Sequence, residues 1–182
     1  MDQLKEISYR KLVVILQLAY SAEQAAAYAY RGHWHSVSDT EERARILQIE
    51  NEEWHHRELV GEMLKSLGEQ PNKQREWRSW WIGKVLAVLC HVMGWFAPMY
   101  GAGRLESGNV REYEMAARHA RDCGHPEFVD CLLTMAEVEW DHEYYFRSRV
   151  LLHSLGKRLK LWQPPPPKEN IRESFAREGS GA

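Results

Sequence analysis

Apolar residues recur every three or four positions through most of the chain, as they do on the buried face of an α-helix. This pattern predicts four amphipathic helices, over residues 8–34, 38–67, 104–122 and 126–155, the third with an alternative start at Met99. Each of the last three is followed by a glycine that serves as a helix stop: Gly68, Gly124 and Gly156. A capping box from Ser38 to Glu41 marks the start of the second helix. We therefore expect an all-α protein built as a four-helix bundle.

A long apolar segment, residues 79–103, lies in the crossover between the second and third helices, after a polar stretch at 69–78. Its length raises the question of a transmembrane span. Gly94 and Pro98 weaken a continuous helix, however, and the chain has no second apolar run of this kind. Three interpretations stay open: a hydrophobic helix packed on the bundle, a helix that contacts a membrane surface or a lipid-like substrate, and a true membrane span.

The remaining chain organisation is simple. Residues 1–160 form one predicted domain, and 182 residues are enough for a single domain with a full core. Residues 161–182 form a predicted tail with four consecutive prolines, Pro164 to Pro167. Such a run favours an extended arm, and we expect the polar end beyond it to be partly disordered.

Composition narrows the function classes. The net charge is −2, which gives no electrostatic basis for binding nucleic acid. The three cysteines, Cys90, Cys123 and Cys131, form no Cys-x-x-Cys pair, so zinc-ribbon and rubredoxin-type sites are not supported. The first residues are polar and do not resemble a signal peptide. We expect a cytoplasmic protein with reduced thiols, with peripheral attachment to the inner membrane face as an alternative.

Two Glu-x-x-His motifs lie on the predicted stripes, Glu53-Trp54-His55-His56 and Glu139-Trp140-Asp141-His142. Residues three apart share one face of a helix, so the carboxylate and the imidazole can reach the same metal ion. Each motif has an upstream glutamate on another stripe, 30 residues earlier in the first case and 33 in the second, and each of these is followed seven residues later by a tyrosine. These upstream pairs are Glu23 with Tyr30 and Glu106 with Tyr113.

Other acidic residues compete for these roles. Glu52-x-x-His55 has the same spacing as the first motif but lies off the apolar stripe. Glu112 and Glu114 share the third helix with Glu106, and neither is on its stripe. We favour the stripe residues, and the choice of the ligand on the third helix stays open.

A glutamate in the seam of each of four helices is costly without a compensating cation, because a buried charge is strongly destabilising. Carboxylates and imidazoles suit iron, and manganese equally. One glutamate from each of two helices and Glu-x-x-His from each of the other two is the di-iron carboxylate pattern. We therefore predict two iron ions, with manganese or a mixed pair as alternatives. The expected metal ligands are Glu23, Glu53, His56, Glu106, Glu139 and His142. Tyr30 and Tyr113 are expected to hydrogen-bond a ligand or to transfer electrons, with core packing as the alternative.

With these motifs, residues 12–150 resemble the ferritin-like di-iron superfamily, and most closely the demethoxyubiquinone hydroxylase family, which is similar in the 30-residue spacing and in the apolar crossover. The resemblance implies that Glu53 and Glu139 bridge the metals, that Glu23 and Glu106 each bind one iron, and that His56 and His142 each bind one. Rubrerythrin-like proteins are similar in the Glu-x6-Tyr pattern too, but they usually carry a rubredoxin-type cysteine module or a further glutamate three residues after the third-helix ligand, where this chain has Asn109.

The function implied is an oxygen-activating oxidoreductase, a monooxygenase or hydroxylase that uses dioxygen on a hydrophobic, quinone- or lipid-like substrate admitted near the apolar crossover. We expect a homodimer with no nucleic-acid partner, and possible membrane contact is confined to residues 79–103. The alternatives are a rubrerythrin-like peroxide reductase, a ferritin-like ferroxidase or iron-binding protein, and a bundle that has lost its metal.

Overall fold

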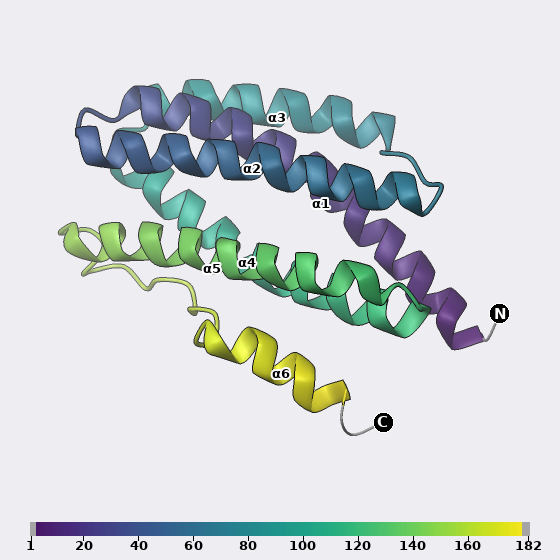
Figure 1. Ribbon diagram of the computed structural model, residues 1–182. Coiled ribbons are helices and arrows are strands. Elements are labelled where there is room, and N and C mark those ends of the chain that lie inside the picture. Colours follow the sequence, from purple (N-terminus) through teal and green to yellow (C-terminus); the bar gives the residue numbers. More distant parts are fainter. Residues whose placement is uncertain (1–2, 180–182) are drawn as a thin grey trace. The chain divides into compact units, whose positions relative to one another are not determined.

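The computed structural model describes residues 3–179, which form six α-helices and one short 3-10 turn, with no strand among them (Figure 1). The all-α prediction is confirmed. The elements are α1 (Gln3–Ser36), α2 (Thr40–Ser66), α3 (Lys73–Val92), α4 (Phe96–Cys123), η1 (Pro126–Phe128), α5 (Val129–Leu152) and α6 (Glu169–Gly179). They fall into two compact units. The N-terminal unit comprises residues 13–98, and the C-terminal unit comprises residues 1–12 and 99–182.

In the N-terminal unit, α2 lies within one or two residues of its predicted bounds at each end. Its N-cap is Asp39, whose side chain accepts a hydrogen bond from the backbone N–H of Glu42. The predicted capping box began one residue too early, at Ser38. Beyond the helix, Gly68 adopts a φ of 74°, a left-handed conformation that glycine accommodates without strain, so this stop is confirmed.

The predicted crossover is divided differently from our expectation. Asn72 caps α3 by accepting hydrogen bonds from the next turn, so half of the expected polar stretch is already helical. The helix then ends at Val92, and Gly94 reverses the chain with a φ of 71°. Pro98 lies in the first turn of α4, where its missing N–H costs nothing. The apolar segment 79–103 is therefore shared by two helices.

The helix α3 packs closely on α1 through glycines. A Cβ added at Gly32 of α1 would lie 2.3 Å from the backbone of Ala87, and one added at Gly83 of α3 would lie 2.7 Å from the carbonyl oxygen of Ala25. A methyl group would clash at both points, so the close approach of the two backbones depends on these glycines. The interpretation of a packed hydrophobic helix holds for this face of α3.

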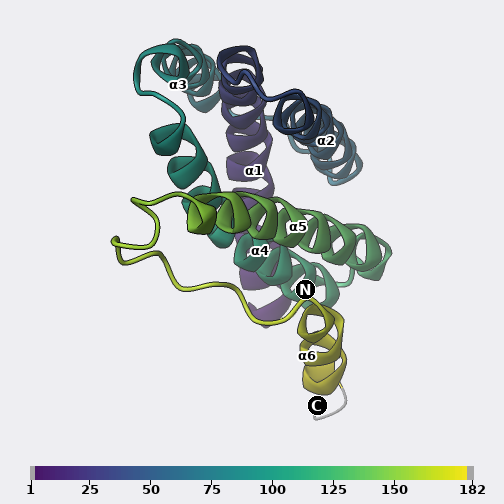
Figure 2. The ribbon, with the colours of Figure 1, turned by 90° about the vertical axis from the view of Figure 1, so that its left-hand side faces the viewer.

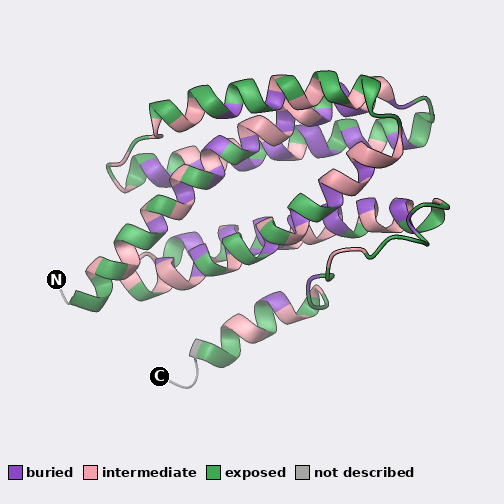
Figure 3. Ribbon diagram, turned by 180° about the vertical axis from the view of Figure 1, so that it is seen from behind, coloured by how far each residue is buried: buried purple, intermediate pink, exposed green. Residues whose placement is uncertain are grey.

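The opposite face of α3 is exposed and apolar. Trp81, Val85, Val88 and Val92 recur at helical spacing and are 49–73% exposed, and Figure 3 shows the helix as mostly exposed or half-buried. Among the described helices, none has the length and apolar character needed to cross a membrane.

In the C-terminal unit, α4 ends at Cys123 and Gly124 follows with a φ of 94°, which confirms a second predicted stop. The predicted helix 126–155 begins as the 3-10 turn η1, with Pro126 in the first turn, and continues as α5. It ends at Leu152, earlier than expected, so Gly156 is not its stop.

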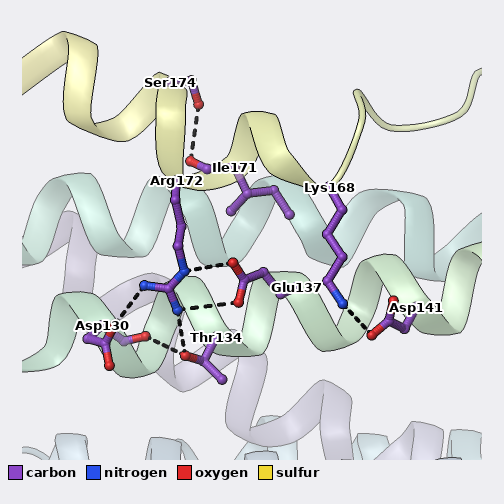
Figure 4. Close-up of polar contacts among 8 residues, drawn as sticks. All are labelled: Asp130, Thr134, Glu137, Asp141, Lys168, Ile171, Arg172 and Ser174. Carbon is purple, nitrogen blue, oxygen red and sulfur yellow. Dashed lines mark hydrogen bonds and ion pairs between the residues drawn. The ribbon is translucent and has the colours of Figure 1, made fainter.

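The tail differs most from the prediction. After an irregular segment that contains the four prolines, residues 169–179 form α6 and not a disordered end (Figure 2). Ile171 is buried, and the Arg172 guanidinium donates to Asp130, Thr134 and Glu137 of α5 (Figure 4). We call residues 162–179 the strap, because they follow α5 and are held to it. Residues 180–182, part of the expected disordered end, lie outside the described residues.

Candidate metal centre

Two helices of the N-terminal unit bring together three of the predicted ligands. Glu53 and His56 share one face of α2, and Glu23 lies on α1. Each offers a ligand atom within 4.8 Å of the other two, and His56 Nδ1 lies 4.0 Å from Glu23 Oε1. All three residues are at most 3% exposed. We call these residues the first triad.

The C-terminal unit repeats the arrangement. Glu139 and His142 share a face of α5, and Glu106 lies on α4. Their ligand atoms again lie within 4.8 Å of one another, and His142 Nδ1 is 3.6 Å from Glu139 Oε2. The three are buried, with at most 1% exposed. This second triad and the first together contain all six predicted ligands.

The donor chemistry of each triad fits one divalent cation. Two carboxylates carry two negative charges, which one such ion would neutralise, and a neutral imidazole completes a set of hard oxygen and borderline nitrogen ligands. Ligands of one ion at about 2 Å lie within about 4 Å of one another, so modest side-chain rotation would suffice. The burial of these ligands also favours a metal site, because a cation bound away from water needs charged protein ligands in place of water molecules.

The competing acidic residues belong to neither triad. Glu52 accepts hydrogen bonds from Arg45 and Gln48, and the side chain of His55 is 66% exposed and pairs with Glu58. On α4, Glu112 is exposed and Glu114 is half-buried, whereas Glu106 is 1% exposed. Neither alternative on α4 belongs to a group of potential ligands among the described residues.

The two tyrosines of the repeat are both buried. Tyr30 is 5% exposed and stacks on His33 with ring centroids 6.5 Å apart, and Tyr113 is 2% exposed. Both lie two helical turns beyond the upstream glutamate of their triad, on the same face. Their predicted roles as hydrogen-bond partners or electron carriers stay predictions.

One residue near the second triad was noted in the sequence only as a departure from rubrerythrin-like proteins. The Asn109 amide nitrogen lies 2.8 Å from Glu106 Oε2 and 3.4 Å from Glu139 Oε2. It therefore donates to a carboxylate on its own helix and approaches one on α5. Its position three residues after Glu106, on the same face, is the signal that could have identified it.

Two further buried glutamates are held by the protein itself. Glu50 accepts hydrogen bonds from Arg31, Trp34 and Trp54, and Glu143 accepts them from Arg147 and Trp162. Each is at most 3% exposed. A buried carboxylate is therefore not in itself a sign of metal in this protein. What distinguishes the triads is that two carboxylates and an imidazole gather within 4.8 Å.

Comparisons of the chain with protein-family models, with curated proteins and with solved structures find no match. The two triads and the repeated sequence pattern are therefore the features that bear on function.

Proposed function

We propose that this protein is a di-iron oxidoreductase that activates dioxygen, with each triad holding one metal ion. The observation that carries the proposal is the occurrence, in each unit, of two carboxylates and one imidazole that are buried and within 4.8 Å of one another. The repeated Glu-x6-Tyr and Glu-x-x-His pattern supports the same metal-binding role for both triads.

The residues around each motif suit a centre from which water is excluded. Ile49 and Val60 flank the first motif on α2, and both are fully buried. Met135 and Phe146 flank the second on α5, at 1% and 0% exposure. When bound, two ferrous ions would supply the electrons that reduce dioxygen. The protein would hold the ions through the six ligands and keep bulk water away from them.

We further propose a hydrophobic organic substrate. The support is the apolar outer face of α3, where four large apolar side chains are exposed at helical spacing. Exposed apolar surface of this kind marks a place where an apolar ligand, lipid or protein partner gains free energy by contact. A monooxygenase with such a substrate is favoured over a ferroxidase, whose substrate is a hydrated cation.

Metal analysis tests the proposal directly. After anaerobic incubation with excess Fe²⁺ and removal of unbound metal, the wild-type protein is expected to retain about two iron ions per chain. Glu53→Ala or His142→Ala is expected to remove at least one of them. Glu52→Ala and His55→Ala are matched controls, because these neighbours are solvent-accessible and have the same spacing, and both are expected to keep the full complement.

Full iron stoichiometry in Glu53→Ala and His142→Ala, or loss of iron in the controls alone, would refute the metal assignment. The reaction class is tested separately with the reduced, iron-loaded protein. Rapid consumption of dioxygen in the presence of an apolar quinone or phenol, with oxygen incorporated into the organic product, is expected. Rapid turnover of hydrogen peroxide with no oxygenated product would instead identify a peroxide reductase.

A further inference from the structure

Asn109 lies three residues after Glu106, the upstream glutamate of the second half, whereas the first half has Ala26 three residues after Glu23. Both halves keep the tyrosine seven residues after the glutamate, but the six residues between them differ at every position. Asn109 is thus specific to the second half of the ligand set.

The amide of Asn109 is placed to hold two carboxylates at once. Its nitrogen is 2.8 Å from Glu106 Oε2, a hydrogen bond of ordinary length, and 3.4 Å from Glu139 Oε2. A carboxamide NH₂ has two hydrogens, so it can donate to both oxygens. One of these glutamates lies on α4 and the other on α5, so the contact spans two helices and sets the separation of their carboxylates.

Such a contact affects metal binding through the ligands. A hydrogen bond from a fixed donor restricts the rotation of a carboxylate and orients its other oxygen, and loss of such outer partners typically weakens metal affinity by about 10- to 100-fold. Without this donor, each of the two glutamates would keep one positioning contact fewer, and binding the ion would cost more side-chain entropy.

We propose that Asn109 is a positioning residue that pre-orders Glu106 and Glu139 and so strengthens metal binding by the second triad. The inference rests on the proposed function, because it requires that the second triad binds metal. It adds a residue that acts on the bound ion only through two of its ligands.

The test is a stepwise titration of the metal-free protein with Co²⁺, followed by calorimetry and by the visible absorption of the bound ion. The wild type is expected to bind two Co²⁺ ions. In Asn109→Ala the affinity for one of them is expected to weaken by about 10- to 100-fold and the absorption spectrum to change, with the affinity for the other unaltered. Alanine is the better helix former, so the variant is expected to fold.

Ser107→Ala is the matched control, because Ser107 is on the same helix and its hydroxyl donates to the backbone of Arg104 instead. It is expected to leave both affinities unchanged. Two unchanged affinities in Asn109→Ala would overturn the inference while leaving the proposed function intact. Equal weakening of both affinities with a lowered Tm would also overturn it, since that would indicate a general structural role. A wild-type protein that binds no Co²⁺ would overturn the proposed function itself.

Discussion

The hydrogen bond from Trp162 to Glu143 should be one of the stronger single contacts of the strap. The indole nitrogen lies 2.6 Å from Glu143 Oε1, and the Arg147 guanidinium donates to the same oxygen, also at 2.6 Å. The Arg147 guanidinium also lies over the Trp162 ring, 4.7 Å from its centroid. Because Glu143 is 2% exposed, water cannot readily replace a lost donor. A donor to a buried charge therefore stabilises this packing more than a surface bond would.

The perturbation is Trp162→Phe, which keeps an aromatic ring and removes the indole N–H. A hydrogen bond to a charged group contributes about 1.5–3 kcal/mol, so we expect the free energy of unfolding to fall by about 2 kcal/mol. For a chain of this size that corresponds to a Tm lower by roughly 4–8 °C. Urea unfolding followed by circular dichroism measures the free energy, in the presence of a chelator so that bound metal does not add to it.

The matched control is Trp140→Phe, which removes another indole N–H that forms a hydrogen bond between α5 and the strap. The Trp140 indole donates at 2.8 Å to the backbone carbonyl of Pro166, a neutral and exposed acceptor. A neutral bond of this kind contributes about 1 kcal/mol or less. The reasoning would be refuted if Trp162→Phe cost no more than Trp140→Phe, because the charge and burial of Glu143 would then contribute nothing.

Two further predictions concern the N-terminal unit. Burial lowers the pKa of His33 from 6.5 to about 4, so the unfolded chain binds a proton at this side chain more readily than the folded protein does. Above about pH 6.5 the side chain is neutral in both states and folding has no cost at this position. As the pH falls toward about 4, the unfolded chain is protonated first and the free energy of unfolding decreases. Between pH 7 and 4.5 the free energy of unfolding should fall by about 2–3 kcal/mol more in the wild type than in His33→Gln, and equal pH profiles would contradict this. Gly32→Ala should destabilise the protein by about 1–3 kcal/mol in urea unfolding, because its Cβ would lie 2.3 Å from the Ala87 backbone. Gly101→Ala, with nothing within 4 Å, should be neutral or stabilise by up to about 1 kcal/mol, and a common sign for both changes would contradict the packing argument.

The helices could be predicted from the sequence because their causes are local. The apolar stripes, the polar start of α2 and the glycines after α2 and α4 act within a few residues, and these features appear in the structure near their expected positions. The errors lie where local signals compete. Asn72 begins a helix inside a stretch that reads as polar crossover, since its capping bonds outweigh the composition of the first turn.

The strap could not be predicted, because what orders it is distant in sequence. Arg172 contacts residues 35 to 42 positions away, and Lys168 pairs with Asp141. Composition favoured disorder, and nothing in the local pattern of the tail indicates that α5 presents carboxylates at matching intervals. Two contacts of the strap involve the second Glu-x-x-His motif. Trp140 and Asp141, the residues between Glu139 and His142, both form hydrogen bonds with the strap. The two residues that the motif leaves unspecified thus stabilise the packing of the strap on α5.

Not every acidic residue in a helical seam requires a cation. Glu50 and Glu143 are as deeply buried as the predicted ligands, and guanidinium and indole donors satisfy them. From sequence alone they could not be separated from the triads, because their donors come from residues up to 19 positions away. The triads differ from these single carboxylates in the number of charges. One arginine can pair a single buried carboxylate, whereas two ionised carboxylates within 4.8 Å of each other repel, and a divalent cation between them would neutralise both. The inference to metal therefore rests on the short separation within each triad, and a protein that tolerated Glu53→Gln and Glu139→Gln with higher stability and no change in bound metal would show that this repulsion is relieved in another way.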